Sequence, residues 1–150
     1  MIKKLLSLST FFVLSLLFFV GCTGMQAPEP NDYTIKLPNN YVVLHVNAKT
    51  IVIGLKEKDN SITCYKDEDS NNKLIGIESF VSEFCHNDRF VGAKQVDIDI
   101  QSNIDESHPR FYLLDTKEQK IYGPFKSKEL FDKQCTELKI SNLSSWKKTN

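Results

Sequence analysis

Short runs of apolar residues, separated by turn residues, dominate the chain from residue 33 onward. Residues 33–37 alternate apolar and polar side chains, residues 38–40 (Pro-Asn-Asn) have the composition of a tight turn, and residues 41–46 are rich in β-branched and aromatic side chains. Two similar runs follow at 50–55 and 61–65. Runs spaced by about 8 to 12 residues are typical of antiparallel strands joined by short connections. The pattern therefore predicts an antiparallel meander.

The same alternation returns after a turn at residues 86–88. Between residues 89 and 100, Val96, Ile98 and Ile100 are predicted to face one side of a strand, with Gln95, Asp97 and Asp99 on the other. Residues 101–110 are predicted to form a polar loop, residues 111–115 a strand, and residues 116–120 a turn into a strand ending at Gly123-Pro124.

Residues 74–85 fit two interpretations. Ile77, Phe80, Val81 and Phe84 recur at the spacing of one helix face, which favours a short amphipathic helix. Ile75 and Ile77 also alternate as in a strand, so the strand remains open.

The last part of the chain changes to a helical period. Ser127 is a candidate N-cap and Glu129 favours the first helical turn. The predicted helix, 127–138, carries a stripe with Cys135 and Leu138 facing inward; the full stripe is Leu130, Phe131, Gln134, Cys135 and Leu138. Leu143 and Trp146 are expected to pin the chain end. The expected fold class is α+β: an antiparallel β-sheet of about five to seven strands with a C-terminal α-helix packed on it.

The N-terminus has the parts of a bacterial export signal. Lys3 and Lys4 precede an apolar run at 5–20, and Gly21 is a small residue beside Cys22. This arrangement resembles a lipobox, where a diacylglycerol is attached to the cysteine before cleavage. An uncleaved membrane helix is the alternative, but it needs about 20 apolar residues and this run is shorter. We expect a lipoprotein signal peptide at 1–21, a lipidated tether at 22–32 and a single α+β domain at 33–150.

Lipidation of Cys22 can be tested directly. Replacing Cys22 with Ser removes the thiol that accepts the lipid, so the Cys22→Ser protein should accumulate as a heavier, unprocessed precursor on a denaturing gel. Two or three acyl chains would anchor the mature protein firmly, since each buried methylene adds about 0.8 kcal/mol. Unchanged gel mobility would contradict lipidation.

Charge and cysteine content narrow the expected partners. Lys3 and Lys4 are the only charged residues before Cys22, so the remaining chain carries 17 basic and 19 acidic side chains. This balance indicates no basic face for nucleic acid and no polybasic patch for anionic lipid, so the acyl chains on Cys22 must provide membrane attachment. The expected location is extracytoplasmic, on a bacterial membrane. Three other cysteines, Cys64, Cys85 and Cys135, lie among apolar or aromatic neighbours and are interpreted as small buried hydrophobes, although one pair could form a disulfide.

Several segments resemble a family of small bacterial lipoproteins named domain of unknown function 3997. They are Phe90-Val91-Gly92-Ala93-Lys94-Gln95, Phe111-Tyr112-Leu113-Leu114-Asp115-Thr116, Ile121-Tyr122-Gly123-Pro124, the helix with Glu129, Leu130 and Phe131, and an opening strand and turn at 32–41. The likeness covers most of residues 32–138, and the polar stretches 56–73 and 97–110 would be insertions. It implies a location and a fold, but no chemistry. Within it, Asp115 is expected to accept backbone N–H groups of the next turn, and Gly123-Pro124 to end a strand.

One segment has the spacing of a calcium-binding loop. Asp67, Asp69 and Asn71 occupy positions 1, 3 and 5, and Glu78 occupies position 12. Asn72 stands where such a loop has Gly, and no incoming helix is recognisable. An acidic hairpin loop in solvent is the plainer interpretation. Calcium is therefore a possible ligand and no other cofactor is expected; calorimetry without heat at millimolar calcium would exclude it.

Acidic residues also raise the possibility of hydrolysis. Asp97, Asp99, Asp105 and Glu106 could supply the paired carboxylates of a glycosidase, which would require Asp97, Asp99 or Glu106 to meet a histidine in a pocket. An acidic strand edge in solvent is the plainer interpretation. The three histidines, His45, His86 and His108, are scattered, and no nucleophile elbow, zinc-protease or phosphate-loop motif occurs in the sequence. Three function classes remain: a non-catalytic module that binds or inhibits an envelope or secreted protein, an envelope hydrolase, and a calcium-responsive structural lipoprotein. The first is favoured, with catalytic residues absent.

Overall fold

The computed structural model describes residues 33–68, 71–99, 101 and 103–149. The predicted signal peptide, the tether and Cys22 lie outside this range. Within it, no helix combines the length and the apolar character needed to cross a membrane. The main sheet consists of β1 (Tyr33–Lys36), β2 (Tyr41–Asn47), β3 (Thr50–Lys56), β4 (Ile62–Thr63), β7 (Phe80–His86), β8 (Phe90–Ile98), β9 (Ile104–Asp115), β10 (Lys120–Phe125) and β11 (Lys147–Lys148).

Three smaller elements complete the described chain. A 3-10 turn, η2 (Pro38–Asn40), joins β1 to β2, and its two asparagines adopt positive φ angles of 55° and 64°, a conformation that Asn tolerates better than most residues. A separate two-stranded hairpin is formed by β5 (Tyr65–Glu68) and β6 (Asn71–Leu74). The helix α2 (Lys128–Glu137) follows β10.

The sheet is mixed, which corrects the prediction of a purely antiparallel one. Its order is β1-β2-β3-β7-β8-β9-β10, with β4 on β3 and β11 on β7. The β3–β7 contact is parallel and rests on one residue pair, Ile51 with Phe80, because Ile53 instead bridges Ile77 in an antiparallel sense. Within the described residues, the main sheet has nine strands, which also exceeds the five to seven predicted. Strands distant in sequence are neighbours here, which no local pattern reports.

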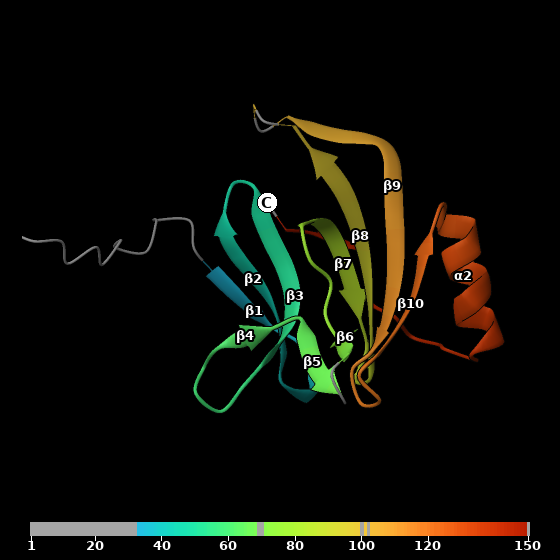
Figure 1. The fold of residues 1–150 in the computed structure, drawn as a ribbon. Coiled ribbons are helices and arrows are strands. Elements are labelled where there is room, and N and C mark those ends of the chain that lie inside the picture. The colour runs from blue at the N-terminus through green and yellow to red at the C-terminus, as the bar shows by residue number, and fades with distance from the viewer. Residues whose placement is uncertain (1–32, 69–70, 100, 102, 150) are drawn as a thin grey trace, which may run out of the picture.

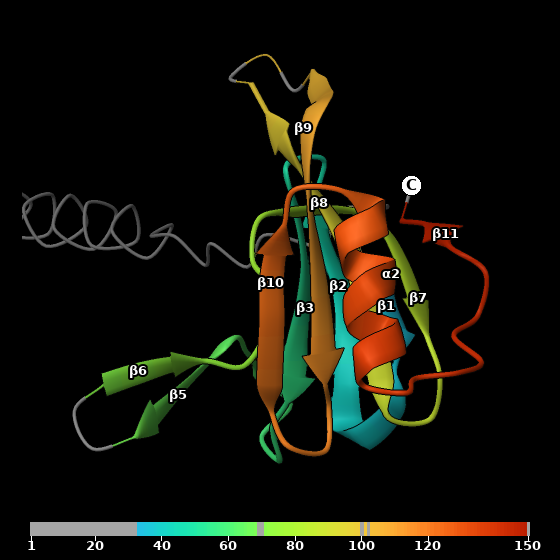
Figure 2. The same ribbon diagram turned by 90° about the vertical axis from the view of Figure 1, so that its right-hand side faces the viewer.

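A hydrophobic cluster lies between the two parts of the sheet. Figure 1 shows β1–β3 on one side of the molecule and β8–β10 beside α2 on the other, and Figure 2 shows β2 and β3 behind β8–β10. Both sets of strands contribute buried side chains to this cluster, with several fully inaccessible. Its members are Leu37, Tyr41, Val43, Ile51, Ile53, Ile77, Phe80, Val81, Phe84, Val91, Ala93, Val96 and Leu114.

The helix α2 covers the opposite face of β8–β10 (Figure 2). Ser127 is its N-cap, with the Ser127 side chain accepting a hydrogen bond from the Leu130 amide, as predicted. Phe131 and Cys135, one helical turn apart, are the buried residues of the helix, whereas Leu138 is 37% exposed. The predicted inward position of Leu138 is therefore wrong, because the helix ends at Glu137. The second cluster, beneath α2, contains Phe111, Leu113, Phe131 and Cys135, flanked by Phe90, Tyr122, Phe125, Ile140, Leu143 and Trp146.

Residues 74–85 contain no helix; they contain the end of β6, a bridge at Ile77 and most of the strand β7. β7 lies between β8 on one side and β3 and β11 on the other. Phe80, Val81, Phe84 and Cys85 are all buried, so the strand is apolar on both faces. A strand of this kind loses the alternating pattern, and its apolar run can then match a helical spacing by coincidence.

Two polar stretches are also more ordered than the sequence indicates. Residues 101–110, predicted as a loop, contain most of the outer half of β9, where exposed residues give no apolar alternation. Residues 56–73 contain β4, β5 and part of β6. Figure 2 shows the β5–β6 hairpin and the far end of β8–β9 as two projections from the body. In each projection, the two strands pair through backbone hydrogen bonds outside the core. Polar side chains do not prevent this pairing.

Cys85 and Cys135 are buried as predicted, and Cys64 is half-buried. All three are free thiols. Burial raises the pKa of the Cys64 thiol to about 11 and that of Cys85 to about 12. These thiols therefore stay protonated at neutral pH, which makes them poor nucleophiles.

Candidate functional site: a groove beside strand β8

A groove of about 630 Å³ opens between the β2–β3 turn and the outer end of β8; we call it the β8 groove. Lys49, Thr50 and Val52 form one wall, and residues 96–99 form the other. Glu78, Ser79 and Phe80 line it between these walls. In Figure 1 the β8–β9 end bends toward the β2–β3 turn, above the start of β7. The groove thus lies where the two parts of the sheet separate.

The groove exists because β8 is longer than its neighbour β7. The last residue pair between them is Phe80 with Val96, whereas β8 continues to Ile98 and pairs there with β9. The chain before β7 turns away at Ser79, whose φ is 67°. Among the described strands, none pairs with Asp97 and Ile98 on the groove side. A short strand edge is therefore exposed inside a concave site.

A buried glutamine connects the floor of the groove to its β8–β9 wall. Gln95 is 8% exposed, and its side-chain amide donates a hydrogen bond to the backbone carbonyl of Glu78. The Gln95 side-chain oxygen accepts hydrogen bonds from Arg110 Nε at 2.8 Å and from the Tyr112 hydroxyl at 3.2 Å. Arg110 in turn lies 2.5 Å from Asp97. These contacts hold the groove in a defined shape, and they bury Gln95, which was predicted to share a strand face with Asp97 and Asp99, whereas those two aspartates are exposed.

Carboxylates give the groove its charge. The hydrogen bond from Arg110 lowers the pKa of Asp97 below its usual range. Hydrogen bonds from Asn103 lower the pKa of Asp99, and the positive charge of Lys49 adds to this effect. Both aspartates are consequently ionised at neutral pH. Glu78 accepts a hydrogen bond of 2.5 Å from the Tyr65 hydroxyl, which raises the pKa of Tyr65 and connects the β5–β6 hairpin to the groove.

The structure brings together residues that the sequence assigned to separate sites. Glu78, from the predicted calcium loop, lines the same groove as Asp97 and Asp99, from the predicted hydrolase set. Glu106 lies outside it and pairs with Lys94 at 2.9 Å. Sequence reasoning missed Lys49 and Phe80 in the groove lining, and also Gln95 and Arg110, which support the groove from outside that lining. The only signal for Gln95 was an amide within a strand that also carries Lys94 and Asp97, which does not single it out.

The calcium interpretation stays a prediction. Asp67 lies in β5 and Asn71 in β6, the two strands of one hairpin, while Asp69 is outside the described residues. Glu78 lies beyond β6 and is bound to Tyr65. Across the part of the chain that the structure describes, no cluster of three or more His, Cys, Asp or Glu residues is placed to hold a metal.

The histidines remain apart from the groove lining. His45 is 8% exposed, stacks on Tyr33 with ring centroids 4.9 Å apart, and its Nδ1 lacks a hydrogen-bond partner. The backbone N–H of His86 donates to the Ser144 hydroxyl in the C-terminal segment, and the backbone C=O of His86 accepts from the Ser144 N–H. His108 contacts Ser107 and is near enough to Asp97 to help lower its pKa, but it does not line the groove.

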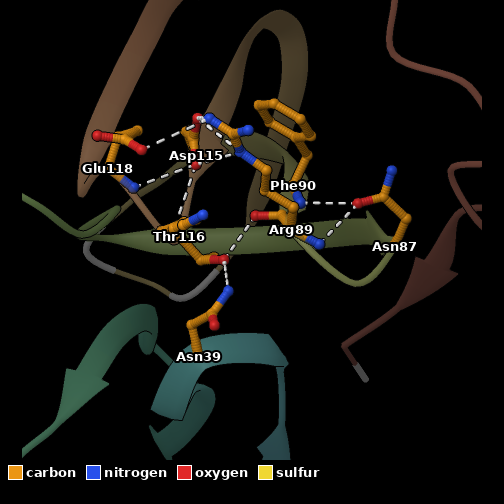
Figure 3. A network of polar contacts seen from close by, with 8 residues as sticks. Asn39, Asn87, Arg89, Phe90, Asp115, Thr116 and Glu118 are labelled. Carbon is orange, nitrogen blue, oxygen red and sulfur yellow. Dashed lines mark hydrogen bonds and ion pairs between the residues drawn. The ribbon is translucent and has the colours of Figure 1, made fainter.

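A second polar network stabilises the opposite end of the sheet (Figure 3). The Arg89 guanidinium binds Asp115 through two nitrogens, at 3.0 and 2.6 Å, and Asp115 also accepts the backbone amides of Lys117 and Glu118, as its position before a turn predicts. Asn39 donates to the Thr116 hydroxyl, which donates to the Arg89 carbonyl. Figure 3 shows these side chains bonded to one another across three turns, which is a structural arrangement.

Gly123 and Pro124 differ from their predicted role. They lie inside β10, which continues to Phe125, and do not end the strand. The peptide bond between them is cis, and the register with β9 shifts between Tyr122 and Phe125. The two residues therefore form an irregularity in an edge strand, where proline is tolerated.

One protein family matches a range of this chain that includes both the groove and the Asp115 network. The model of the family described as Protein of unknown function (DUF3997) matches residues 38–149. The chain belongs to this family. No curated protein and no solved structure matched it. Membership of DUF3997 covers the whole β8 groove and the Asp115 network, but it assigns no activity to either.

Proposed function

We propose that this DUF3997 protein is a non-catalytic, lipid-anchored envelope protein that binds another protein through the β8 groove. The observation that carries the proposal is the exposed edge of β8 at Asp97 and Ile98, held inside a groove of about 630 Å³. Concave sites that combine apolar side chains with a few fixed polar groups are typical binding sites. Acylation of Cys22 would confine this site to the membrane surface.

The electrostatics of the groove favour binding over hydrolysis. A glycosidase needs one carboxylic acid whose pKa is raised so that it can donate a proton. Asp97 and Asp99 are exposed and their pKa values are lowered by hydrogen bonds from Arg110 and Asn103. These aspartates are suited to attract a cationic group and poorly suited to act as general acids. Hydrolysis would require a different acid.

Site-specific photocrosslinking in cells tests the proposal. A photoreactive phenylalanine analogue replaces Lys49, in the groove wall, and in a matched control replaces Lys133, whose side chain is 73% exposed on α2. We expect a discrete crosslinked adduct from position 49 and none from position 133. The adduct from position 49 should weaken in the Cys22→Ser background, where the protein is not anchored normally.

Two outcomes would contradict the proposed function. Equal adducts from positions 49 and 133 would mean that contacts are not specific to the groove. No adduct from position 49, together with turnover of an envelope polysaccharide or peptide by the purified protein, would favour the hydrolase. The Asp97→Asn variant would then identify whether the groove carboxylate is involved.

A further inference from the structure

We infer that the β8 groove binds an extended, basic segment of its partner, which adds as a strand to the edge of β8. This inference rests on the proposed function and specifies the chemistry of the ligand. Its first support is the backbone: β8 extends past its last β7 partner, and because Asp97 and Asp99 direct their backbone groups toward β9, the N–H and C=O of Ile98 face the groove, where no described strand pairs with them. Extended peptides bind such edges by main-chain hydrogen bonds, and pockets select their side chains.

Apolar groups beside this edge provide the selecting surface. Val52 and Phe80 line the groove next to the β8 edge, and Ile98 is half-buried against the main hydrophobic cluster. In an extended peptide, alternate side chains point the same way. Every second side chain of the bound segment would therefore contact this apolar lining, while the intervening side chains point outward.

The charge of the groove determines which charge the bound segment of the partner should carry. Asp97 and Asp99 line the groove and are exposed, and Arg110 pairs with Asp97 from outside the lining. Glu78 adds a carboxylate from the groove floor, and Lys49 supplies one positive charge opposite. The excess of negative charge attracts a basic segment and repels an acidic one.

The same acidic edge has a second explanation. Charged side chains on a strand edge also protect proteins against unwanted pairing. The two explanations predict opposite results with a short peptide, because a protective edge should reject every added strand. The groove favours the binding role, since a protective edge has no need of an adjoining concave site that also presents Val52 and Phe80.

Three synthetic peptides separate these possibilities, using the full-length Cys22→Ser protein. The probe is a blocked heptapeptide of alternating lysine and valine; the first control has glutamate in place of lysine, and the second keeps the lysines but has N-methyl groups on alternate backbone amides. We expect saturable binding of the probe, with each control binding about tenfold more weakly because it lacks the charge or the main-chain hydrogen bonds. The probe should also slow hydrogen exchange at the amide of residue 98.

A conservative variant localises the binding. Asp99→Asn keeps a side-chain oxygen for the turn at Asn103 but removes the charge, so the probe should bind several-fold more weakly. The matched control, Asp132→Asn on α2, should bind it unchanged. Equal binding of the N-methylated peptide, equal binding of the glutamate peptide, or no saturable binding of the probe would each overturn the inference. A position-49 adduct in cells without peptide binding would overturn it while leaving the proposed function intact.

Discussion

Replacing Phe131 with alanine is expected to lower the free energy of unfolding by about 3 to 5 kcal/mol, the range for truncating a buried phenylalanine. Phe131 is 1% exposed and is the central contact of α2 with the sheet. Its ring lies near those of Phe111, Phe125 and Trp146, with centroids 6.4, 6.4 and 5.5 Å away. Removing it leaves a cavity that three aromatic rings cannot readily fill.

Urea denaturation measures this loss, and the single tryptophan of the chain reports on the same cluster by fluorescence. Leu130→Ala is the matched control. Leu130 precedes Phe131 in the same helix but is 49% exposed, so its truncation should cost about 1 kcal/mol or less. Similar urea midpoints for the Phe131 and Leu130 variants would show that α2 is not anchored by Phe131.

Loss of the Asp115 carboxylate is expected to destabilise the protein by about 2 to 3 kcal/mol in the Asp115→Ala variant, because the groups that donate to this carboxylate lose their acceptor. The Asp115 side chain is 4% exposed, whereas Arg89 is 47% exposed and can return partly to water. The main cost therefore falls on the amides of Lys117 and Glu118, which lose their acceptor in the turn.

The matched control for Asp115 is Glu118→Ala. Glu118 lies 3.8 Å from the same arginine but is 60% exposed. Exposed ion pairs contribute about 0 to 1 kcal/mol, so the urea midpoint should change little. Equal destabilisation by the two variants would contradict a special role for the buried carboxylate.

The Asp115 network also predicts the sign of a pH effect. Burial acts to raise the pKa of Asp115, but hydrogen bonds from Arg89 and from two backbone amides outweigh it and hold the pKa below its ordinary value. A carboxyl group with a lowered folded-state pKa contributes stability that is fully present above its unfolded pKa, about 3.9, and is lost as the pH falls through the folded pKa. Wild-type stability should thus fall below about pH 4 more steeply than that of Asp115→Asn, compared by urea midpoints at each pH.

Local chemistry was sufficient for several parts of the fold. The β1–β2–β3 meander is recognisable because its β-branched and aromatic runs, separated by turn residues, supply side chains to the core. Ser127 begins α2 because its hydroxyl satisfies a free backbone amide. Asp115 accepts the amides of the turn that follows it for the same local reason. Each of these features depends on residues within a few positions of one another. Short segments of this kind also suggested the family, which the match over residues 38–149 shows.

The sequence identified some residues of the β8 groove but did not place them in one site. Glu78, Asp97 and Asp99 were recognised as chemically notable, but the sequence separated Glu78 from the others and offered no reason to join them. Their convergence depends on Gln95, which bonds the Glu78 carbonyl and Arg110 at once. A contact between residues so far apart leaves no periodic trace, since it reflects chain packing and not local conformation.

The sequence by itself determined local elements of this protein: the strands built from apolar runs between turns, the capped C-terminal helix and the Asp115 turn. Lipid attachment at Cys22 stays a prediction. Only the tertiary structure decided that β7 lies beside β3 in a parallel orientation and that β8 extends beyond its last residue pair with β7. The physical reason is that a strand buried on both faces has no pattern to identify it, and strand neighbours are chosen by the packing of the whole core. The exposed β8 edge, on which the proposed function rests, is a product of that packing.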